Sequence, residues 1–289
     1  MTQMPGVLDW LAVGDAGLEY SRSNPDGILG GAAARLAIHA AALGASVALV
    51  AKLGDDDAGR RASEILRRTK VELRWLQRAA GASTTAFHAE KGEAGGWHVE
   101  LGADAALRLD ELPSAAVTPA MLLVVSGYSL RVEPARSAAL GALASAGARQ
   151  ARAALFLPAE LLWQTNSRMT LRMLEPAISR AHTLALAKED LSLLFGSERE
   201  PREALRSLSE MGPKVIYLAD QHGAVWLREA GRTHAYAPPK VHEPRDRYAG
   251  AAAFWVGISQ GKPAGLAAQA SVRYAQAVRR AGLPPVVKP

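Results

Sequence analysis

Short apolar runs alternate with longer segments of helical periodicity along most of this chain. The runs are nearly continuous in Val, Leu and Ala, which is typical of parallel strands covered on both faces. The expected strands are Leu8–Val13, Ser46–Ala51, Met121–Ser126, Ala153–Leu157, Thr183–Ala187, Lys214–Leu218 and Ala224–Arg228, and the expected helices are Ala32–Leu43, Ala58–Lys70, Pro134–Ala146, Ala249–Gln260 and Gly265–Ala281. This order predicts repeated β–α–β units and an α/β fold around a mostly parallel central sheet.

One region departs from this rhythm. Thr84–Glu90 and Trp97–Gly102 alternate apolar and polar residues around a glycine-rich turn, which predicts a β-hairpin over about 84–102. A lone hairpin is marginally stable in water. We therefore expect it to pair with the first strands of the chain or with a second subunit, and a two-fold homodimer is the simplest assembly.

Length and composition exclude several classes of protein. The chain of 289 residues is 49% hydrophobic and shows no repeat, linker or low-complexity tail, so we expect one domain over 1–289. It lacks cysteine, and its seven histidines form no metal-binding motif, so no metal site is expected from them. The net charge of +6 comes largely from dispersed arginines, which indicates a solvated surface and not a nucleic-acid partner. Without a membrane-length apolar run or a signal peptide, we expect a cytoplasmic protein.

The stretch Asp246–Phe254 reads D-R-Y-A-G-A-A-A-F. It resembles D-T-T-G-A-G-D-A-F, the signature of the ribokinase (phosphofructokinase-B, PfkB) family of carbohydrate and nucleoside kinases. The resemblance extends over almost the whole chain and includes Gly102–Leu107, which is similar to G-A-N-x-x-L. It implies a ribokinase-like fold with helices on both faces of the sheet and a small β lid. It also implies ATP and Mg²⁺ as partners in phosphoryl transfer.

On the substrate side, the resemblance points to residues near the start of the chain. Glu19 falls where the family has a substrate-binding Asp, although it also fits an exposed loop. Gly30 and Gly31 begin a stretch like G-G-x-x-x-N-x-A and allow close approach of a ligand or simply a tight turn. Arg35 replaces the family's Asn and would favour an anionic group unless it reaches solvent. Asp55 belongs to a stretch similar to x-G-x-D-x-x-G, whose role is mainly architectural.

On the phosphate side, the resemblance is incomplete. Ala187 and Asp190 stand in place of N-x-x-E, and Asp220 to Gly223 keeps only the last glycine of T-x-G-x-x-G. Asp220 would repel the phosphates of ATP.

The catalytic signature itself has lost its base. Ala249, Gly250 and Ala251 are the remnant of the family's anion hole, where helix N–H groups face a phosphate. The family's catalytic Asp falls on Ala252, and a general base contributes about 10²- to 10⁴-fold to rate.

These departures lead to three hypotheses about function. The first is a degenerate sugar or nucleoside kinase homologue, a pseudoenzyme with weak or no phosphotransferase activity that retains a cleft for a small polyhydroxylated or anionic molecule. The second is an active, divergent ATP-dependent carbohydrate kinase that uses another base, for which Glu19 and Asp55 are the candidates. The third is a non-enzymatic ligand sensor or structural subunit.

Overall fold

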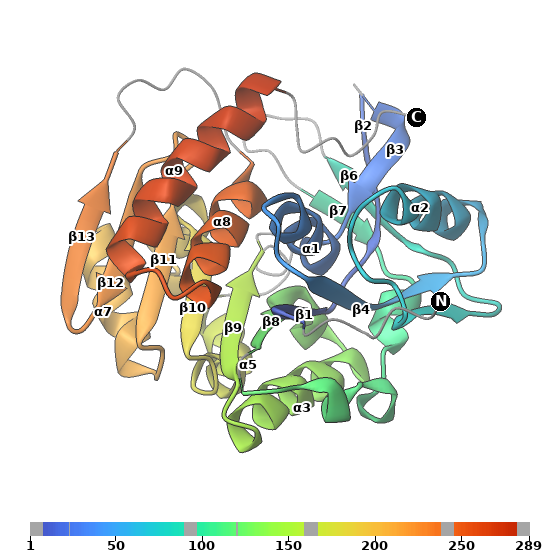
Figure 1. Ribbon diagram of the computed structural model, residues 1–289, viewed down its shortest axis with the longest axis horizontal. Coiled ribbons are helices and arrows are strands. Elements are labelled where there is room, and N and C mark those ends of the chain that lie inside the picture. Colours follow the sequence, from blue (N-terminus) through green and yellow to red (C-terminus); the bar gives the residue numbers. More distant parts are fainter. Residues whose placement is uncertain are drawn as a thin grey trace.

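The chain folds around one large twisted sheet (Figure 1). The computed structural model describes residues 8–22, 24–89, 97–119, 121–158, 167–237 and 246–281. In the described residues this sheet has nine strands in the order β13-β12-β11-β10-β9-β8-β1-β4-β5. They are β1 (Trp10–Val13), β4 (Val47–Gly54), β5 (Leu76–Ala79), β8 (Leu122–Ser126), β9 (Arg152–Leu157), β10 (Thr183–Ala187), β11 (Val215–Ala219), β12 (Val225–Glu229) and β13 (Arg232–Tyr236). All neighbours are parallel except for the antiparallel pairs β11–β12 and β12–β13.

Helices cover both faces of this sheet, as the sequence predicts (Figure 1). One face packs against α1 (Ala32–Ala42), α2 (Asp57–Arg67), α8 (Arg247–Ser259) and α9 (Ala264–Ala281). The other packs against α3 (Ala135–Ala148), α5 (Ser167–Ile178), α6 (Leu191–Phe195) and α7 (Pro201–Glu210). Along β1, Trp10 and Ala12 enter the first layer while Leu11 and Val13 enter the second, because successive side chains of a strand alternate between faces. Burial on both faces explains why the strands are apolar throughout.

A second, smaller sheet forms the lid. It consists of β2 (Gly17–Ser21), β3 (Asn24–Gly30), β6 (Thr85–Ala89) and β7 (Trp97–Glu100) in the order β3-β2-β6-β7. The predicted hairpin is confirmed as the antiparallel pair β6–β7, and its partner is the early strand β2 of the same chain. The expected turn at 92–96 lies outside the described residues. The lid sheet packs against α2 on one side and places Phe87 and Val99 against Tyr128 on the other.

The segment between the lid and β8 winds through three short 3₁₀ turns: η1 (Ala103–Ala106), η2 (Leu109–Glu111) and η3 (Ser114–Ala116). The buried Lys52 of β4 holds the first two together. Its Nζ donates to the Ala106 carbonyl at 3.1 Å and to both Glu111 carboxylate oxygens at 2.6 Å. This ion pair fixes the path of the chain from the lid to the central sheet.

No helix in the described ranges combines the length and the apolar character that a membrane span requires.

Candidate active site

The site lies where β1 ends and α1 begins, beneath the lid. Asp15 follows β1 and is buried, and its carboxylate accepts hydrogen bonds from Ala32 N at 2.6 Å and Ala33 N at 3.2 Å. Burial raises the pKa of Asp15. The first amides of α1 are therefore satisfied from within the chain, by a residue that the sequence analysis did not single out.

Gly30 and Gly31 lie directly before α1. Gly31 has φ +92°, and a Cβ there would come within 2.6 Å of the Asp15 carbonyl oxygen, so no other residue fits without strain. A Cβ at Gly30 would come within 2.9 Å of Phe87 in the lid. Packing within the chain thus accounts for both glycines, and their role toward a ligand stays a prediction.

Arg35 is the centre of an ion-paired group. Its Nη1 lies 2.9 Å from Glu19 Oε2 in β2, and its Nη2 lies 2.6 Å from Asp246 Oδ2 at the start of α8. The guanidinium also lies over the Tyr248 ring at 4.6 Å. We call Glu19, Arg35 and Asp246 the Arg35 cluster. The opposing carboxylates raise the pKa of Arg35 even though burial acts to lower it.

The Arg35 cluster changes two expectations from the sequence. Glu19 is part of a lid strand and bonded to Arg35, so it is not an exposed loop carboxylate. Arg35 does not extend freely into solvent, because only 22% of its side chain is exposed. Its Nη1 and Nη2 atoms each form an ion pair with a carboxylate. Two carboxylates face one guanidinium, so attraction of an anionic ligand no longer follows from Arg35 alone.

Asp246 also caps α8. Its Oδ1 accepts from Tyr248 N at 2.8 Å and Ala249 N at 3.2 Å, while Oδ2 binds Arg35 and lies 3.6 Å from His39 Nε2. Arg35 and His39 keep the pKa of Asp246 far below its usual range against the effect of burial. The Asp246 carboxylate therefore accepts hydrogen bonds from the first amides of α8. One of these is the amide of Ala249, the first residue of the expected anion hole.

Ala252 lies one turn further along α8 and belongs to the main apolar core. Its exposed fraction is 0%, and Ala249 and Ala251 are equally buried. Gly250 faces Tyr217, whose hydroxyl would lie 2.7 Å from an added Cβ. Small side chains allow α8 to pack closely on α1 and the sheet, so the position expected to hold the base is enclosed by packed atoms.

The acidic run at the start of α2 contains one residue with a clear structural task. Asp56 caps α2 by accepting from Gly59 N at 2.8 Å, and it binds the amide and hydroxyl of Thr84 at 2.8 and 2.6 Å. Asp55, the residue proposed for substrate binding, is exposed. The motif therefore attaches α2 to the lid, in keeping with its expected architectural role.

The residues expected to face a nucleotide lie at the ends of β10 and β11. Ala187 ends β10, and Asp190 is buried at the start of α6. Asp220 accepts from His222 N and Ala224 N at 2.9 and 2.8 Å, which shapes the turn that Gly223 closes with φ +84°.

Glu189 joins these two loops by accepting from Gln221 N at 2.8 Å. Glu189 was not predicted from the sequence, because nothing in its local pattern indicates a contact 32 positions away.

A second buried carboxylate lies beside the lid. Asp104 in η1 has 3% exposure and accepts a hydrogen bond from the Thr85 hydroxyl, which itself accepts from Gly102 N at 2.8 Å. Burial, with a smaller contribution from Asp15, raises the pKa of Asp104 from 3.8 to about 7. Its Oδ2 is buried without a hydrogen-bond partner among the described residues. Asp104 lies within the stretch Gly102–Leu107 that resembles G-A-N-x-x-L, but the sequence alone predicts no role for it.

Solved structures with the same fold include a riboside kinase and a fructokinase. Aminoimidazole riboside kinase from Salmonella enterica superposes with a TM-score of 0.80 at 18% identity, over 93% of this chain and 92% of that chain. Fructokinase from Vibrio cholerae gives 0.80 at 18% identity, over 93% and 90%. At these identities the similarity establishes the ribokinase-like fold, which confirms the fold class expected from the sequence.

The sequence itself establishes the family. The family model of pfkB family carbohydrate kinases matches residues 24–282, so this chain belongs to that family.

Two curated relatives show how far the similarity extends. The chain is 31% identical over 194 residues to probable fructokinase-4 of Arabidopsis thaliana, covering 65% of this chain and 59% of that protein. It is 26% identical over 215 residues to 5-dehydro-2-deoxygluconokinase of Shouchella clausii, covering 73% and 64%. The chain thus spans about three fifths of the length of these relatives.

Proposed function

We propose that this protein is a degenerate member of the pfkB family that has lost efficient phosphoryl transfer and keeps a cleft for a small polyhydroxylated molecule. The observation that carries this proposal is the burial of one residue of helix α8. Ala252, where the family places its catalytic Asp, lies in the apolar core.

The residues present fit ATP and Mg²⁺ poorly. Ala187 offers no side-chain oxygen, and the Asp220 carboxylate is engaged in its own turn. Within the described ranges, no three His, Asp or Glu side chains gather in a way that would hold a metal ion. We therefore assign no step of a reaction to a bound nucleotide.

The second candidate is an active, divergent carbohydrate kinase. The fructokinases among its relatives favour it. It would need another base, and the two acids considered are poorly suited to that role. Glu19 is ion-paired with Arg35, and Asp55 is exposed to water. A third possibility is a non-enzymatic ligand sensor or structural subunit, whose role would be binding of a ligand or a partner protein and not turnover.

Binding distinguishes these candidates before any rate is measured. Isothermal titration with fructose, a nucleoside and fructose 6-phosphate, each with and without MgATP, tests the cleft. The degenerate-kinase proposal expects binding of a neutral polyol without enhancement by MgATP. Tight MgATP binding that strengthens sugar binding would favour the active kinase.

Arg35→Asn adds a test of ligand class. If Arg35 selects anions, the variant loses affinity for fructose 6-phosphate more than for fructose. Equal effects on both ligands would show that the Arg35 cluster does not select charge, which is the result we now favour.

A two-fold homodimer through the lid and a cytoplasmic location remain proposals. The lid sheet has edge strands β3 and β7, each paired on one side only among the described residues, and such edges can pair with a second copy. Multi-angle light scattering at micromolar concentration tests the dimer, and a monomeric mass would refute it.

A further inference from the structure

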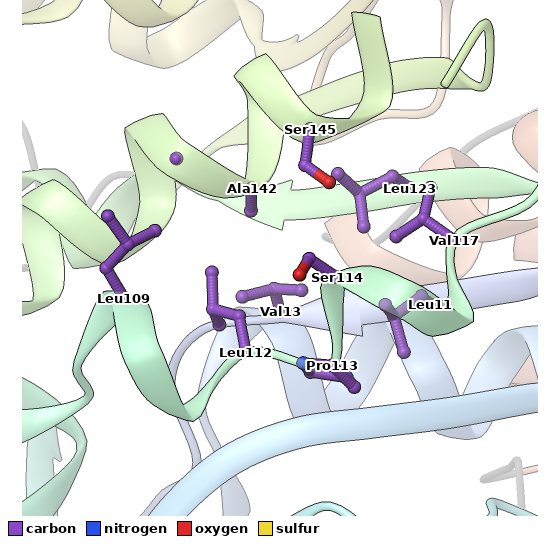
Figure 2. A pocket seen from close by; sticks show the side chains of 11 residues that line it. Leu11, Val13, Leu109, Leu112, Pro113, Ser114, Val117, Leu123, Ala142 and Ser145 are labelled. Carbon is purple, nitrogen blue, oxygen red and sulfur yellow. The ribbon is translucent and has the colours of Figure 1, made fainter. Parts of the chain in front are cut away.

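A pocket of about 170 Å³ lies between the central sheet and α3, on the face of the sheet opposite α1 and α8 (Figure 2). Its floor is apolar and comes from the strands, with Leu11 and Val13 of β1 and Leu123 of β8. Its walls come from α3 on one side and from the η2–η3 segment on the other. The pocket is separate from the Arg35 cluster, which lies on the α1 and α8 side of the sheet.

Leu109, a large apolar side chain that lines the pocket, is 54% exposed. Leu109 lies against Gly141 of α3, and its Cδ1 occupies the place where a Cβ at Gly141 would lie. The helix therefore has no side chain at the point where the two walls meet.

Two hydroxyl groups interrupt the apolar lining. Figure 2 shows Ser114 on η3 and Ser145 on α3, with their oxygens between the two walls. Within the described part of the chain, neither hydroxyl has a side-chain hydrogen-bond partner. None of the described residues that line the pocket is ionisable, so a charged ligand would find no counter-charge there.

We propose that this pocket is a binding site for an uncharged molecule with an apolar body the size of one six-membered ring and one hydroxyl or carbonyl group. The volume sets the size, since an apolar cavity of roughly 150 Å³ holds benzene. The two serines determine the polar group, because each hydroxyl can donate or accept one hydrogen bond at the edge of an otherwise apolar surface. The proposal does not depend on whether the Arg35 side of the protein transfers phosphate.

Benzyl alcohol is a suitable probe, and toluene is its match without the hydroxyl. Both are titrated into protein labelled at Leu and Val methyl groups, and methyl chemical shifts are followed by NMR. We expect saturable shifts at Leu11, Val13 and Leu123, with a dissociation constant of roughly millimolar for a ligand of this size. Methyl groups in the layer beneath α8, such as Leu49, should not shift.

Three variants locate the site. Ala142→Leu fills the pocket from α3 and should abolish binding, and Ala142→Val serves the same purpose if the larger residue disturbs folding. Ala144→Leu is the matched control, because Ala144 lies on the same helix but is exposed. Ser145→Ala should weaken benzyl alcohol about three- to tenfold, the effect of one hydrogen bond, and leave toluene unchanged.

The absence of saturable shifts with either probe would overturn the proposal. So would binding that survives Ala142→Leu or Ala142→Val in a folded protein. If Ser145→Ala and Ser114→Ala leave the affinities for both toluene and benzyl alcohol unchanged, the proposed role of the serines in binding a ligand hydroxyl is refuted.

Discussion

Arg35 Nη2 lies 2.6 Å from Asp246 Oδ2, so one ion pair joins helix α1 to the start of α8 across 211 positions of sequence. The same guanidinium holds Glu19 of the lid. In the sequence, Arg35 stands where the family has a neutral Asn, and Asp246 is the first residue of an eroded signature. In the folded chain, Arg35 and Asp246 form an ion pair, and together with Glu19 this pair connects the lid, α1 and α8.

The Arg35 cluster should contribute to the stability of the folded protein. Arg35→Asn leaves Glu19 and Asp246 facing each other without a positive charge, which should lower the free energy of unfolding by about 1–3 kcal/mol, since breaking a largely buried pair is costly. Urea denaturation followed by circular dichroism measures this change.

The control for this prediction is Arg60→Asn. Arg60 pairs with Asp57 on an exposed face, and such pairs contribute at most about 1 kcal/mol. Equal effects of the two substitutions would contradict a structural role for the Arg35 cluster.

Asp104 should make the stability of the protein depend on pH near neutrality. Burial raises the pKa of Asp104 to about 7, so the folded state holds a proton that the unfolded chain has released. The resulting stability is fully present below about pH 4 and is lost as the pH rises through 7. Asp104→Asn keeps the side chain neutral at every pH. The free energy of unfolding of this variant, measured relative to wild type, should therefore be higher at pH 8 than at pH 5 by about 1–3 kcal/mol.

Denaturation curves at pH 5 and pH 8 for wild type, Asp104→Asn and Asp55→Asn test this prediction. Asp55 is exposed, so its variant should follow the wild-type dependence on pH. Parallel pH profiles for wild type and Asp104→Asn would show that Asp104 is ionised throughout this range.

Restoring the base alone should fail. Ala252→Asp places a carboxylate in the apolar core, which should destabilise the protein by about 2–4 kcal/mol and leave it nearly inactive. The control Ala144→Asp, on an exposed helix position, should have a much smaller effect on stability. A stable and active Ala252→Asp protein would show that the substrate can reach this position.

A joint variant has a better prospect of activity. It combines Ala249→Gly, Ala251→Gly, Ala252→Asp and Ala187→Asn, because groups that act as one site recover little when restored singly. Activity in this variant that exceeds that of Ala252→Asp alone by tenfold or more would support the account of a site lost in several parts. Activity no higher than that of the single variant would refute it.

The fold was accessible from the sequence because local pattern determines most of it. The run Thr183–Ala187 is strand β10 as predicted, and Ala32–Leu43 differs from α1 by one residue. Strands β2 and β3 were not predicted, since they mix glycines and polar residues and become strands only through pairing in the lid.

The candidate site was less accessible, because its contacts join distant positions. Arg35 stood out in the sequence only because it replaces the Asn of a family motif. No local pattern could show that Glu19 and Asp246 form ion pairs with it. Asp15 and Asp104 differ from surface acids only in their burial, which depends on how the lid meets β1 and η1. Nothing in the local pattern marks Lys52, yet its Nζ joins η1 and η2 from within the fold.

The proposed function requires that this pfkB family chain transfers phosphate inefficiently. The most direct measurement is release of ADP from MgATP by the purified, unmodified protein, with fructose, other sugars and nucleosides as acceptors. We expect turnover that is absent or very slow with every acceptor. Turnover of any one of them at about 1 s⁻¹ or faster, an ordinary rate for a kinase, would contradict the claim and identify the protein as an active, divergent kinase.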